Sequence, residues 1–548
     1  MRARPAPAAL LLVVVALLAM PSLASASSLT RSGGVYTYTG SSGNNSITLN
    51  FGVGSFTVSD TENITMAGDG SCTGENGPSI SCTVTATSID FDMGAGLDGA
   101  QVNNVGVQGT IPITGQGGTG DDSINVTSSF ATGAATTATL SDTDGNDSLT
   151  LNVTGTGVSS TFGYGTVNGG PGNDSVRGTG TVNGDAGNDT LSGFNPGSGS
   201  VTLNGGTEND TFPIYESHPE VANGGSGTDT VDYRQASNVT LSLDGAANDG
   251  PTGSQVDNAN GDFSVEIVRT GGNTDNITGG TGSEQFFAGA GDDVINGGGG
   301  DDIMDGESGA DTYIGGGNGA GGDTVTYESR SATVRVSPDG ISANDGEANE
   351  LDNIAADVEN ILGGFENDYI LGNSGNNSFN GGPGDDQLEG GDGNDTLTGG
   401  FGQDKLEGGA NNDTLHGNGG DDTLDGGNDT DTINGGGGAD LLDGSGGTDT
   451  LNGENGSDRL LTRDNLADTA NCGNGTDHSV HDAAGDTINA DCEISDTGAA
   501  GFDQAVTREV VRETTVVNSP VVDDGKQAVV TCAVTRARRA GVRVKCRV

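Results

Sequence analysis

Residues 390–398 are GGDGNDTLT, and this nine-residue unit recurs with variations eleven times, without a gap, from Gly363 to Leu461. Glycine occupies position 1 of all eleven units, and aspartate occupies position 6 of ten, the exception being Asn377. Position 8 is always apolar, at Ile370, Phe379, Leu388, Leu397, Leu406, Leu415, Leu424, Ile433, Leu442, Leu451 and Leu460. A repeat of constant length determines the architecture before any local propensity does, because every unit folds in the same way.

Each unit combines a turn with a short strand. Its first six residues are turn formers, and glycine permits the positive φ angles of tight turns. Its last three residues, with the apolar residue in the centre, fit a strand whose apolar side chain points inward. Two units therefore close one coil of an all-β, right-handed parallel β-roll or β-helix solenoid, in which turns on the same side recur every 18 residues.

The 18-residue period divides the position-6 residues into two rows. One row holds Asp368, Asp386, Asp404, Asp422, Asp440 and Asp458, and the other holds Asn377, Asp395, Asp413, Asp431 and Asp449. Neighbours in a row are one strand spacing apart, about 4.8 Å. Two carboxylates at that distance repel by about 3–4 kcal/mol at an effective dielectric constant near 20. Residues 363–461 hold 20 acids against Lys405 and Arg459, so the segment carries 20 − 2 = 18 negative charges.

A cation between successive turns would reverse this repulsion. Asp carboxylates and the carbonyls of glycine-rich turns are the oxygen ligands that Ca²⁺ prefers. The two rows would hold about nine ions, the weakest beside Asn377, and metal binding and folding should be a single event. We predict these ligands in residues 363–461: Asp368, Asp386, Asp395, Asp404, Asp413, Asp422, Asp431, Asp440, Asp449 and Asp458.

A shorter array of four units covers residues 279–314 and adds Asp293, Asp302 and Asp311 as predicted calcium ligands, with Glu284 at position 6 of its first unit. Each array follows a non-repeat insert that resembles a β-hairpin. The segment that precedes each array is duplicated, since DTVDY at 229–233 recurs as DTVTY at 323–327. Scattered units place Asp122, Asp174, Asp189 and Asp210 at position 6, and we expect these rungs to be isolated, without a partner on the same side.

The nonapeptides resemble the RTX, or haemolysin-type, calcium-binding repeat. The resemblance covers residues 363–461 most fully and implies a parallel β-roll that binds Ca²⁺. RTX proteins of Gram-negative bacteria commonly leave the cell by a one-step route without an N-terminal signal. This chain departs from that pattern, because residues 1–26 resemble an N-terminal secretory signal. It is similar instead to the Sec-exported, glycine- and aspartate-rich calcium-binding proteins of actinobacteria.

The composition favours thin stacked coils outside the cytoplasm. The formal net charge of −57 speaks against nucleic acid and anionic membranes as partners, and 101 glycines with no tryptophan argue against a conventional enzyme core. Residues 1–26 have the basic start, apolar stretch and small-residue end of a secretory signal peptide, and no later segment is apolar enough to span a membrane. We therefore predict a secreted, extracellular protein.

Six cysteines occur as three sequence-local couples: Cys72 with Cys82, Cys472 with Cys492, and Cys532 with Cys546. An oxidising compartment makes disulfides the expected state. Six cysteines permit 15 connectivities, and local pairing is favoured because each couple brackets a short segment. No Cys-x-x-Cys occurs, which argues against zinc.

These observations divide the chain into nine segments: signal peptide 1–26, irregular β or β-helix region 27–165, degenerate repeats with a first insert 166–278, first nonapeptide array 279–314, second insert 315–362, main calcium-binding array 363–461, disulfide capping rung 462–498, linker 499–527, and basic β-hairpin tail 528–548.

The zinc-protease, nucleophile-elbow and phosphate-loop motifs are all absent from the sequence. The first hypothesis is therefore a non-enzymatic calcium-binding protein with a structural, surface or matrix role. A polysaccharide- or peptide-active enzyme with its site in residues 27–270 and an adhesin are the alternatives. The basic tail is either a solvated strand face or a contact for an anionic surface polymer or the acidic roll.

Overall fold

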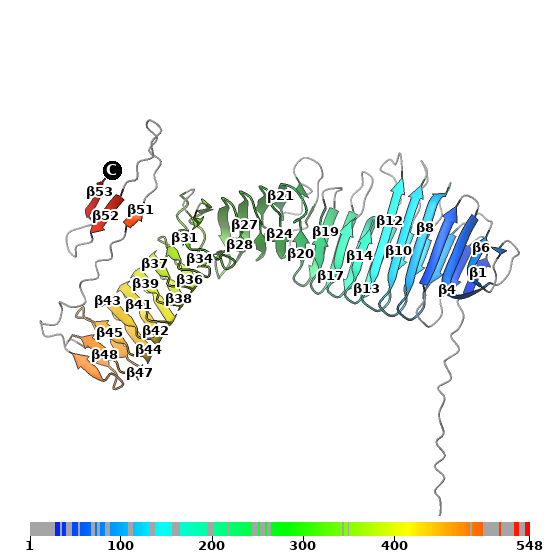
Figure 1. Ribbon diagram of the computed structural model, residues 1–548. Coiled ribbons are helices and arrows are strands. Elements are labelled where there is room, and N and C mark those ends of the chain that lie inside the picture. Colours follow the sequence, from blue (N-terminus) through cyan, green and yellow to red (C-terminus); the bar gives the residue numbers. More distant parts are fainter. Residues whose placement is uncertain are drawn as a thin grey trace, which may run out of the picture.

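The computed structural model describes most residues from Ser28 to Asp496, the longest gaps being 131–137, 156–164 and 194–200, and three short strands beyond. The predicted signal peptide and most of the predicted linker lie outside the described residues. Every regular element in the described part of the chain is a β-strand. The coils stack into an elongated solenoid whose axis changes direction near β31 and β34 (Figure 1).

The solenoid begins with strands that are mostly antiparallel. The pairs β1–β2, β3–β4, β4–β6 and β5–β6 are antiparallel, and β2 and β3 then pair in parallel with β7 and β8, where the regular stack starts. The bounds of these first strands are β1 (Ser28–Ser32), β2 (Val35–Thr39), β3 (Ser46–Gly52), β4 (Ser55–Met66), β5 (Cys72–Thr73) and β6 (Gly77–Cys82).

One face of the stack is a parallel sheet that continues along the whole solenoid, called the long sheet below. Its strands, in spatial order, are β8 (Gly99–Val107), β10 (Ser123–Phe130), β12 (Ser148–Gly155), β14 (Ser175–Gly178), β16 (Thr190–Gly193), β18 (Thr211–Pro213), β20 (Thr230–Asp232), β24 (Ile267–Arg269), β26 (Gln285–Phe287), β28 (Ile303–Asp305), β30 (Thr324–Thr326), β34 (Asn360–Leu362), β36 (Ser378–Pro383), β38 (Thr396–Phe401), β40 (Thr414–Gly419), β42 (Thr432–Gly438), β44 (Thr450–Gly456), β46 (Thr469–Asn471) and β49 (Thr487–Ile488).

The opposite face is divided into three sheets. The amino-terminal sheet, joined to the long sheet where β1 pairs with β4, holds β7 (Ser88–Asp92), β9 (Ile113–Gln116), β11 (Ala138–Ser141), β13 (Gly165–Pro171), β15 (Gly180–Ala186), β17 (Val201–Thr207), β19 (Glu220–Ser226) and β23 (Asn258–Ala259). The middle sheet holds β21 (Val239–Ser242), β22 (Gly250–Pro251), β25 (Asn276–Thr278), β27 (Val294–Gly300), β29 (Thr312–Asn318) and β33 (Asn353–Ile354).

The carboxy-terminal sheet completes this face opposite the main array. It holds β31 (Val334–Val336), β32 (Gly346–Glu347), β35 (Tyr369–Leu371), β37 (Gln387–Asp392), β39 (Lys405–Ala410), β41 (Thr423–Asn428), β43 (Leu441–Gly446), β45 (Arg459–Thr462), β48 (His478–His481) and β50 (Ile494–Asp496). A short strand, β47 (Asn474–Gly475), pairs with β44. Beyond the stack, β51 (Thr514–Val516), β52 (Thr531–Thr535) and β53 (Arg543–Arg547) form a separate antiparallel sheet.

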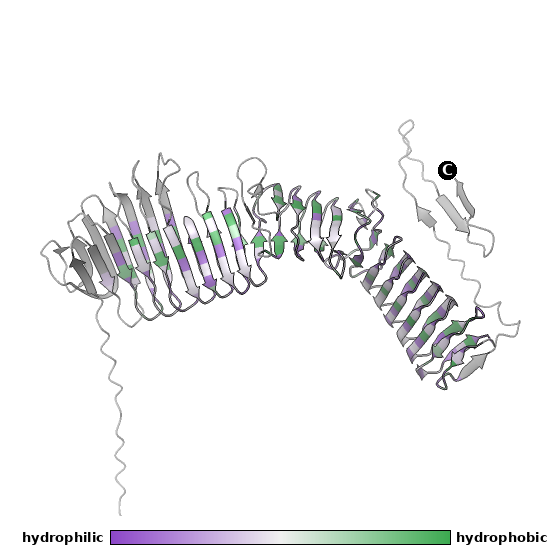
Figure 2. Ribbon diagram, turned by 180° about the vertical axis from the view of Figure 1, so that it is seen from behind, coloured by the Kyte–Doolittle hydropathy of each residue, from purple (hydrophilic) through white to green (hydrophobic). Residues whose placement is uncertain are grey.

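The predicted fold class is confirmed, and so is the position-8 core. All eleven apolar residues of the main array are at most 1% exposed. They alternate between the carboxy-terminal sheet and the long sheet, so the two rows pack against each other inside the roll, and the strands alternate green and purple in Figure 2. The strands are longer than the predicted three residues. Thr396–Phe401, for example, extends through the first three residues of the next unit.

The two inserts contain the predicted hairpins. In the first, β21 pairs antiparallel with β22, and in the second, β31 pairs antiparallel with β32. The sequence resumes parallel stacking after each hairpin, since β21 pairs with β25 and β31 pairs with β35. The excursions therefore interrupt the opposite face without interrupting the long sheet.

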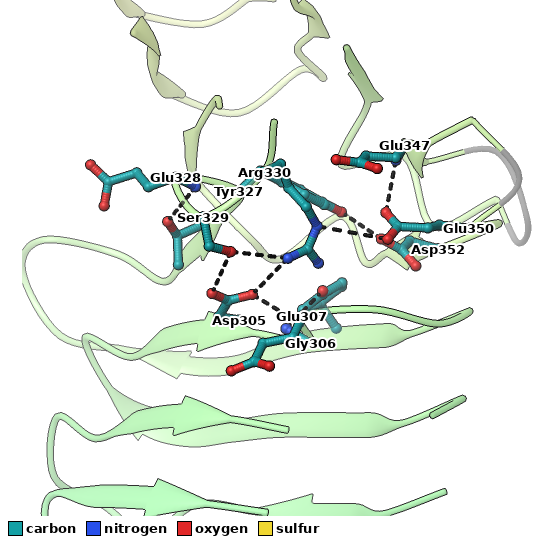
Figure 3. Close-up of polar contacts among 12 residues, drawn as sticks. Asp305, Gly306, Glu307, Tyr327, Glu328, Ser329, Arg330, Glu347, Glu350 and Asp352 are labelled. Carbon is teal, nitrogen blue, oxygen red and sulfur yellow. Dashed lines mark hydrogen bonds and ion pairs between the residues drawn. The ribbon is translucent and has the colours of Figure 1, made fainter. Parts of the chain in front are cut away.

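A buried arginine marks the second of these interruptions (Figure 3). Arg330 is 8% exposed, and its Nη1 and Nε lie 3.6 Å from Oδ1 of Asp305 and 3.7 Å from Oε1 of Glu350. Its guanidinium lies 5.6 Å from the ring centroid of Tyr327, whose hydroxyl donates a 2.9 Å hydrogen bond to Asp352. One guanidinium thus supplies positive charge to carboxylates of the first array and of the second insert.

Candidate metal centre: two ladders of carboxylates

Each position-6 aspartate lies immediately before a strand, and its side chain is held by the neighbouring coil. The backbone N–H of Asp395 donates to Oδ1 of Asp413, and that of Asp413 donates to Oδ1 of Asp431, both at 2.8 Å. The donor of one coil therefore fixes the carboxylate of the next. This arrangement follows from the 18-residue period, because parallel pairing places equivalent residues side by side.

The pattern holds through the main array and sorts its residues into the two predicted rows. The first ladder precedes the strands of the long sheet and runs from Asn377 through Asp395, Asp413, Asp431 and Asp449. The second ladder precedes the strands of the carboxy-terminal sheet and runs from Asp368 through Asp386, Asp404, Asp422, Asp440 and Asp458. All of these N–H···Oδ1 hydrogen bonds are 2.7–2.9 Å long.

The second oxygen of most of these carboxylates is buried without a hydrogen-bond donor. The predicted ligands with such an Oδ2 atom are Asp293, Asp302, Asp311, Asp386, Asp395, Asp404, Asp413, Asp422, Asp431, Asp440 and Asp458. Asp368, the first residue of its row in the main array, differs because its Oδ2 accepts a 2.6 Å hydrogen bond from the N–H of Gly364. A buried carboxylate oxygen without a partner is costly, and its recurrence in most coils points to a ligand that the protein itself does not supply.

Glycine at position 1 keeps the space around this oxygen open. A Cβ atom on Gly390 would collide with Oδ2 of Asp395 and would lie 2.7 Å from the carbonyl oxygen of Gly408 in the next coil. A carboxylate oxygen and a backbone carbonyl therefore face one small volume that only glycine leaves free. Gly391, at position 2, has a φ of 110°, which glycine adopts without strain.

Burial raises the pKa of these carboxyl groups. Desolvation is the main cause, partly offset by the N–H hydrogen bond, and it brings the pKa of Asp395, Asp404 and Asp431 to about 7. Neighbouring carboxylates of the same ladder raise these pKa values further. Without a cation the ladder is therefore electrostatically strained near neutral pH.

The donor set fits a hard cation. It consists of carboxylate and carbonyl oxygens only, which Ca²⁺ accepts in groups of six to eight. The Oδ2 atoms of successive ladder residues and the position-1 carbonyls between them are the groups that would hold such an ion. Soft or nitrogen-seeking metals would find no thiolate or imidazole among these atoms.

A family model for the RTX calcium-binding nonapeptide repeat matches residues 166–191, 177–195, 278–313, 362–397, 389–424, 398–433 and 425–460. The chain carries RTX calcium-binding repeats. No curated protein matches the sequence. The part of the chain that the structure describes contains no helix with the length and apolar character needed to cross a membrane.

The expectation that the scattered RTX units are isolated is wrong. The first ladder begins well before the arrays, with each N–H donating to the next acid at 2.7–2.8 Å through Asp98, Asp122, Asp147, Asp174, Asp189, Asp210, Asp229 and Glu266. The steps are 24, 25, 27, 15, 21, 19 and 37 residues long. These uneven coils conceal the period in the sequence. A local pattern could have revealed these coils: a glycine five residues before an acid that directly precedes an apolar strand, as at Gly169 and Asp174.

The ladders also link the two RTX arrays. The first ladder resumes at Glu284 and continues through Asp302 and Asp323 to Glu359, which directly precedes β34 in the long sheet. The second ladder begins at Asp275 and continues through Asp293 and Asp311 to Asp352, where the second insert interrupts it. Asp302 therefore belongs to one ladder, whereas Asp293 and Asp311 belong to the other.

The stack does not end at Leu461, where the nonapeptide register is lost. The first ladder continues to Asp468 and Asp486, and the second continues to Asp477 and Glu493. The step from Asp449 to Asp468 is 19 residues, so a single added residue breaks the sequence period while the parallel pairing persists. The predicted capping segment is thus made of further coils.

One predicted disulfide is formed within these last coils, between Cys472 and Cys492, whose Cα atoms are 5.2 Å apart. Cys72 lies opposite Cys82, and Cys532 lies opposite Cys546, as paired residues of antiparallel strands. The side chains of these two couples lie outside the described residues, so their disulfides remain predictions.

Proposed function

We propose that this RTX repeat protein is a secreted, non-enzymatic calcium-binding protein whose solenoid folds when Ca²⁺ ions enter the ladders. The rows of buried Oδ2 atoms without donors carry the proposal. Each ladder brings like charges to one strand spacing, where neighbours repel by about 3–4 kcal/mol. One bound ion adds about 2.7 kcal/mol when free Ca²⁺ is 100 times its dissociation constant. Binding and folding are then the same event.

The role that fits such a molecule is structural, at a cell surface or in an extracellular matrix. Millimolar calcium outside the cell would keep the rod folded, whereas a low calcium concentration during export would keep the glycine-rich chain unfolded. The net charge of −57 is then screened by the bound ions instead of by protein cations. Anionic extracellular polymers are repelled by this negative surface. They would therefore need bridging calcium ions to bind to it.

Circular dichroism of the full chain, titrated with Ca²⁺ after chelation, tests the proposal. The β-sheet signal and the melting temperature should rise with calcium and fall again on chelation. Mg²⁺ should be much less effective because it demands near-octahedral geometry and gives up water reluctantly. A folded, calcium-insensitive protein would refute the proposal, and turnover of acidic polysaccharide or casein by the purified protein would refute its non-enzymatic part.

A further inference from the structure

Asp142 occupies a place in its coil where the main array always has glycine. Strand β11 places Ser141 beside Gln116 of β9 and beside Asn168 of β13. Asp142 is therefore in register with Gly117 and Gly169, which are the position-1 glycines of their own units. The turn that follows, residues 142–147, ends in Asp147 at position 6. This coil thus brings a second carboxylate, besides Asp147, to a ladder that has one acid per coil in the main array.

The neighbouring glycine receives this extra side chain. A Cβ atom on Gly117 would collide with Oδ2 of Asp142 and would lie 2.7 Å from Oδ2 of Asp122. The other oxygen of Asp142, Oδ1, accepts a 2.6 Å hydrogen bond from the N–H of Thr143. That hydrogen bond turns Oδ2 of Asp142 into the space above Gly117, towards the ladder.

Three carboxylates converge there. One oxygen from each of Asp122, Asp142 and Asp147 lies within 4.8 Å of the others, and among the described residues no other such group of metal-ligating side chains occurs. The three side chains are 3%, 7% and 3% exposed. Each has a buried Oδ2 that no hydrogen-bond donor reaches, while Oδ1 of Asp122 and of Asp147 accepts the ladder N–H of the preceding coil.

We propose that Asp122, Asp142 and Asp147 form a separate binding site for a hard divalent cation, Ca²⁺, in the coils that precede the matched RTX repeats. Three carboxylates in one pocket carry more charge than the ordinary rung, and calcium affinity rises with the charge of the ligand set. The space above Gly117 holds the ion, and Gly117 is required there because any side chain would fill that space. The site explains an aspartate at position 1 that the nonapeptide pattern does not.

Hydrogen–deuterium exchange of the full chain, read by mass spectrometry over peptides within 113–130 and 138–155, isolates this site from the main array. Peptides within 384–458 serve as an internal reference. In wild type, calcium should protect the first two segments. In Asp142→Asn, the calcium midpoint of their protection should rise by at least about tenfold, because one charged ligand is lost, while the reference peptides keep their midpoint.

Behaviour in chelator distinguishes a metal ligand from a merely structural residue. Without calcium, these segments should be at least as protected from exchange in Asp142→Asn as in wild type, because the substitution removes a repulsive buried charge. Gly117→Ala, whose backbone requires no positive φ, should abolish the calcium response with Asp142 intact. Asp144→Asn is the control, because it removes one negative charge from an exposed residue of the same turn. It should leave the protection of these segments unchanged in both chelator and calcium.

Equal calcium midpoints for wild type and Asp142→Asn would overturn the proposal. So would lower protection of the variant in both chelator and calcium, which would show that Asp142 only supports the turn. The reference peptides separate this result from the function proposed above, because their calcium response does not depend on the three-carboxylate site.

Discussion

The backbone N–H of Asp395 donates a 2.8 Å hydrogen bond to Oδ1 of Asp413, which stands 18 residues later in the chain. Both carboxylates use Oδ1 to accept the backbone N–H of the neighbouring coil, whereas their Oδ2 atoms are buried without a donor. The same side chain serves the fold through Oδ1 and would serve an ion through Oδ2. We therefore expect stability and ion binding to be coupled in the coils that carry such a carboxylate.

Replacing a ladder carboxylate should destabilise the protein in calcium but not in chelator. Asp413→Asn keeps the shape of the side chain and the acceptor for Asp395 but removes one charge. We expect it to lower the free energy of unfolding in calcium by about 1–3 kcal/mol and to leave the folded fraction in chelator unchanged or higher. Asp429→Asn is the matched control, because Asp429 is exposed and has a φ of 73°, which asparagine tolerates. Thermal melts in calcium and circular dichroism in chelator give the answer, and a loss of folded protein under both conditions would argue against an ion at this rung.

Filling the space at position 1 should destabilise the roll, whereas a methyl group at position 3 should not. The Cβ of Gly390→Ala would collide with Oδ2 of Asp395, although the backbone there requires no positive φ. We expect a loss of about 1–3 kcal/mol in calcium. The nearest atom to a Cβ on Gly437 is 3.8 Å away, so Gly437→Ala should be within about 0.5 kcal/mol of wild type. Chemical denaturation in excess calcium compares the two, and similar losses would contradict the role assigned to Gly390.

The dependence of stability on pH should change sign with calcium. Burial raises the pKa of Asp395 and Asp404 from 3.8 to about 7, so without an ion the folded state binds more protons than the unfolded state between these values. Stability in chelator should therefore fall as the pH rises from about 4 to about 7. In calcium it should rise over the same range, because ligands must lose their protons to bind the ion. Circular dichroism in chelator and melting temperatures in calcium, each at pH 4.5 and 7.5, test both slopes, and a change in the same direction under both conditions would rule out the ladder as the ion site.

Removing the buried guanidinium at the second insert should be costly. Arg330→Met leaves Asp305 and Glu350 without their cation, and breaking a buried pair in this way costs about 3–5 kcal/mol. Arg234, in the corresponding part of the first insert, pairs with Asp232 but has a side chain that is 62% exposed. Arg234→Met should therefore change stability by no more than about 1 kcal/mol. Equal effects of the two substitutions on denaturation in calcium would show that Arg330 does not stabilise the junction.

The sequence predicted the parts of this molecule in which the period is constant. Eleven apolar residues at one position determined the inward rows, and the 18-residue spacing determined which aspartates share a ladder. It did not reveal that Asp122 and Asp147 are neighbours in one ladder, because turns of uneven length change the step from coil to coil. Parallel strand pairing accommodates such loops at the surface, but the loops break the fixed period of the sequence.

The extra carboxylate of Asp142 was hidden for a related reason. Its turn, residues 142–147, resembles part of a calcium loop but lacks the glycine and glutamate of an EF-hand. Only the register of β9, β11 and β13 shows that Asp142 occupies a position-1 site beside Gly117. A contact between residues 20 or more apart in uneven coils depends on the three-dimensional register.

The central claim is that ion binding and folding are one event, and it is tested most directly by measuring both on the same samples. The full chain would be equilibrated at a series of free calcium concentrations, with bound calcium determined by atomic emission and the folded fraction by circular dichroism. The two curves should superimpose, with multiple ions bound cooperatively over a narrow range. A chain that is fully folded in chelator and binds calcium only afterwards would contradict the account.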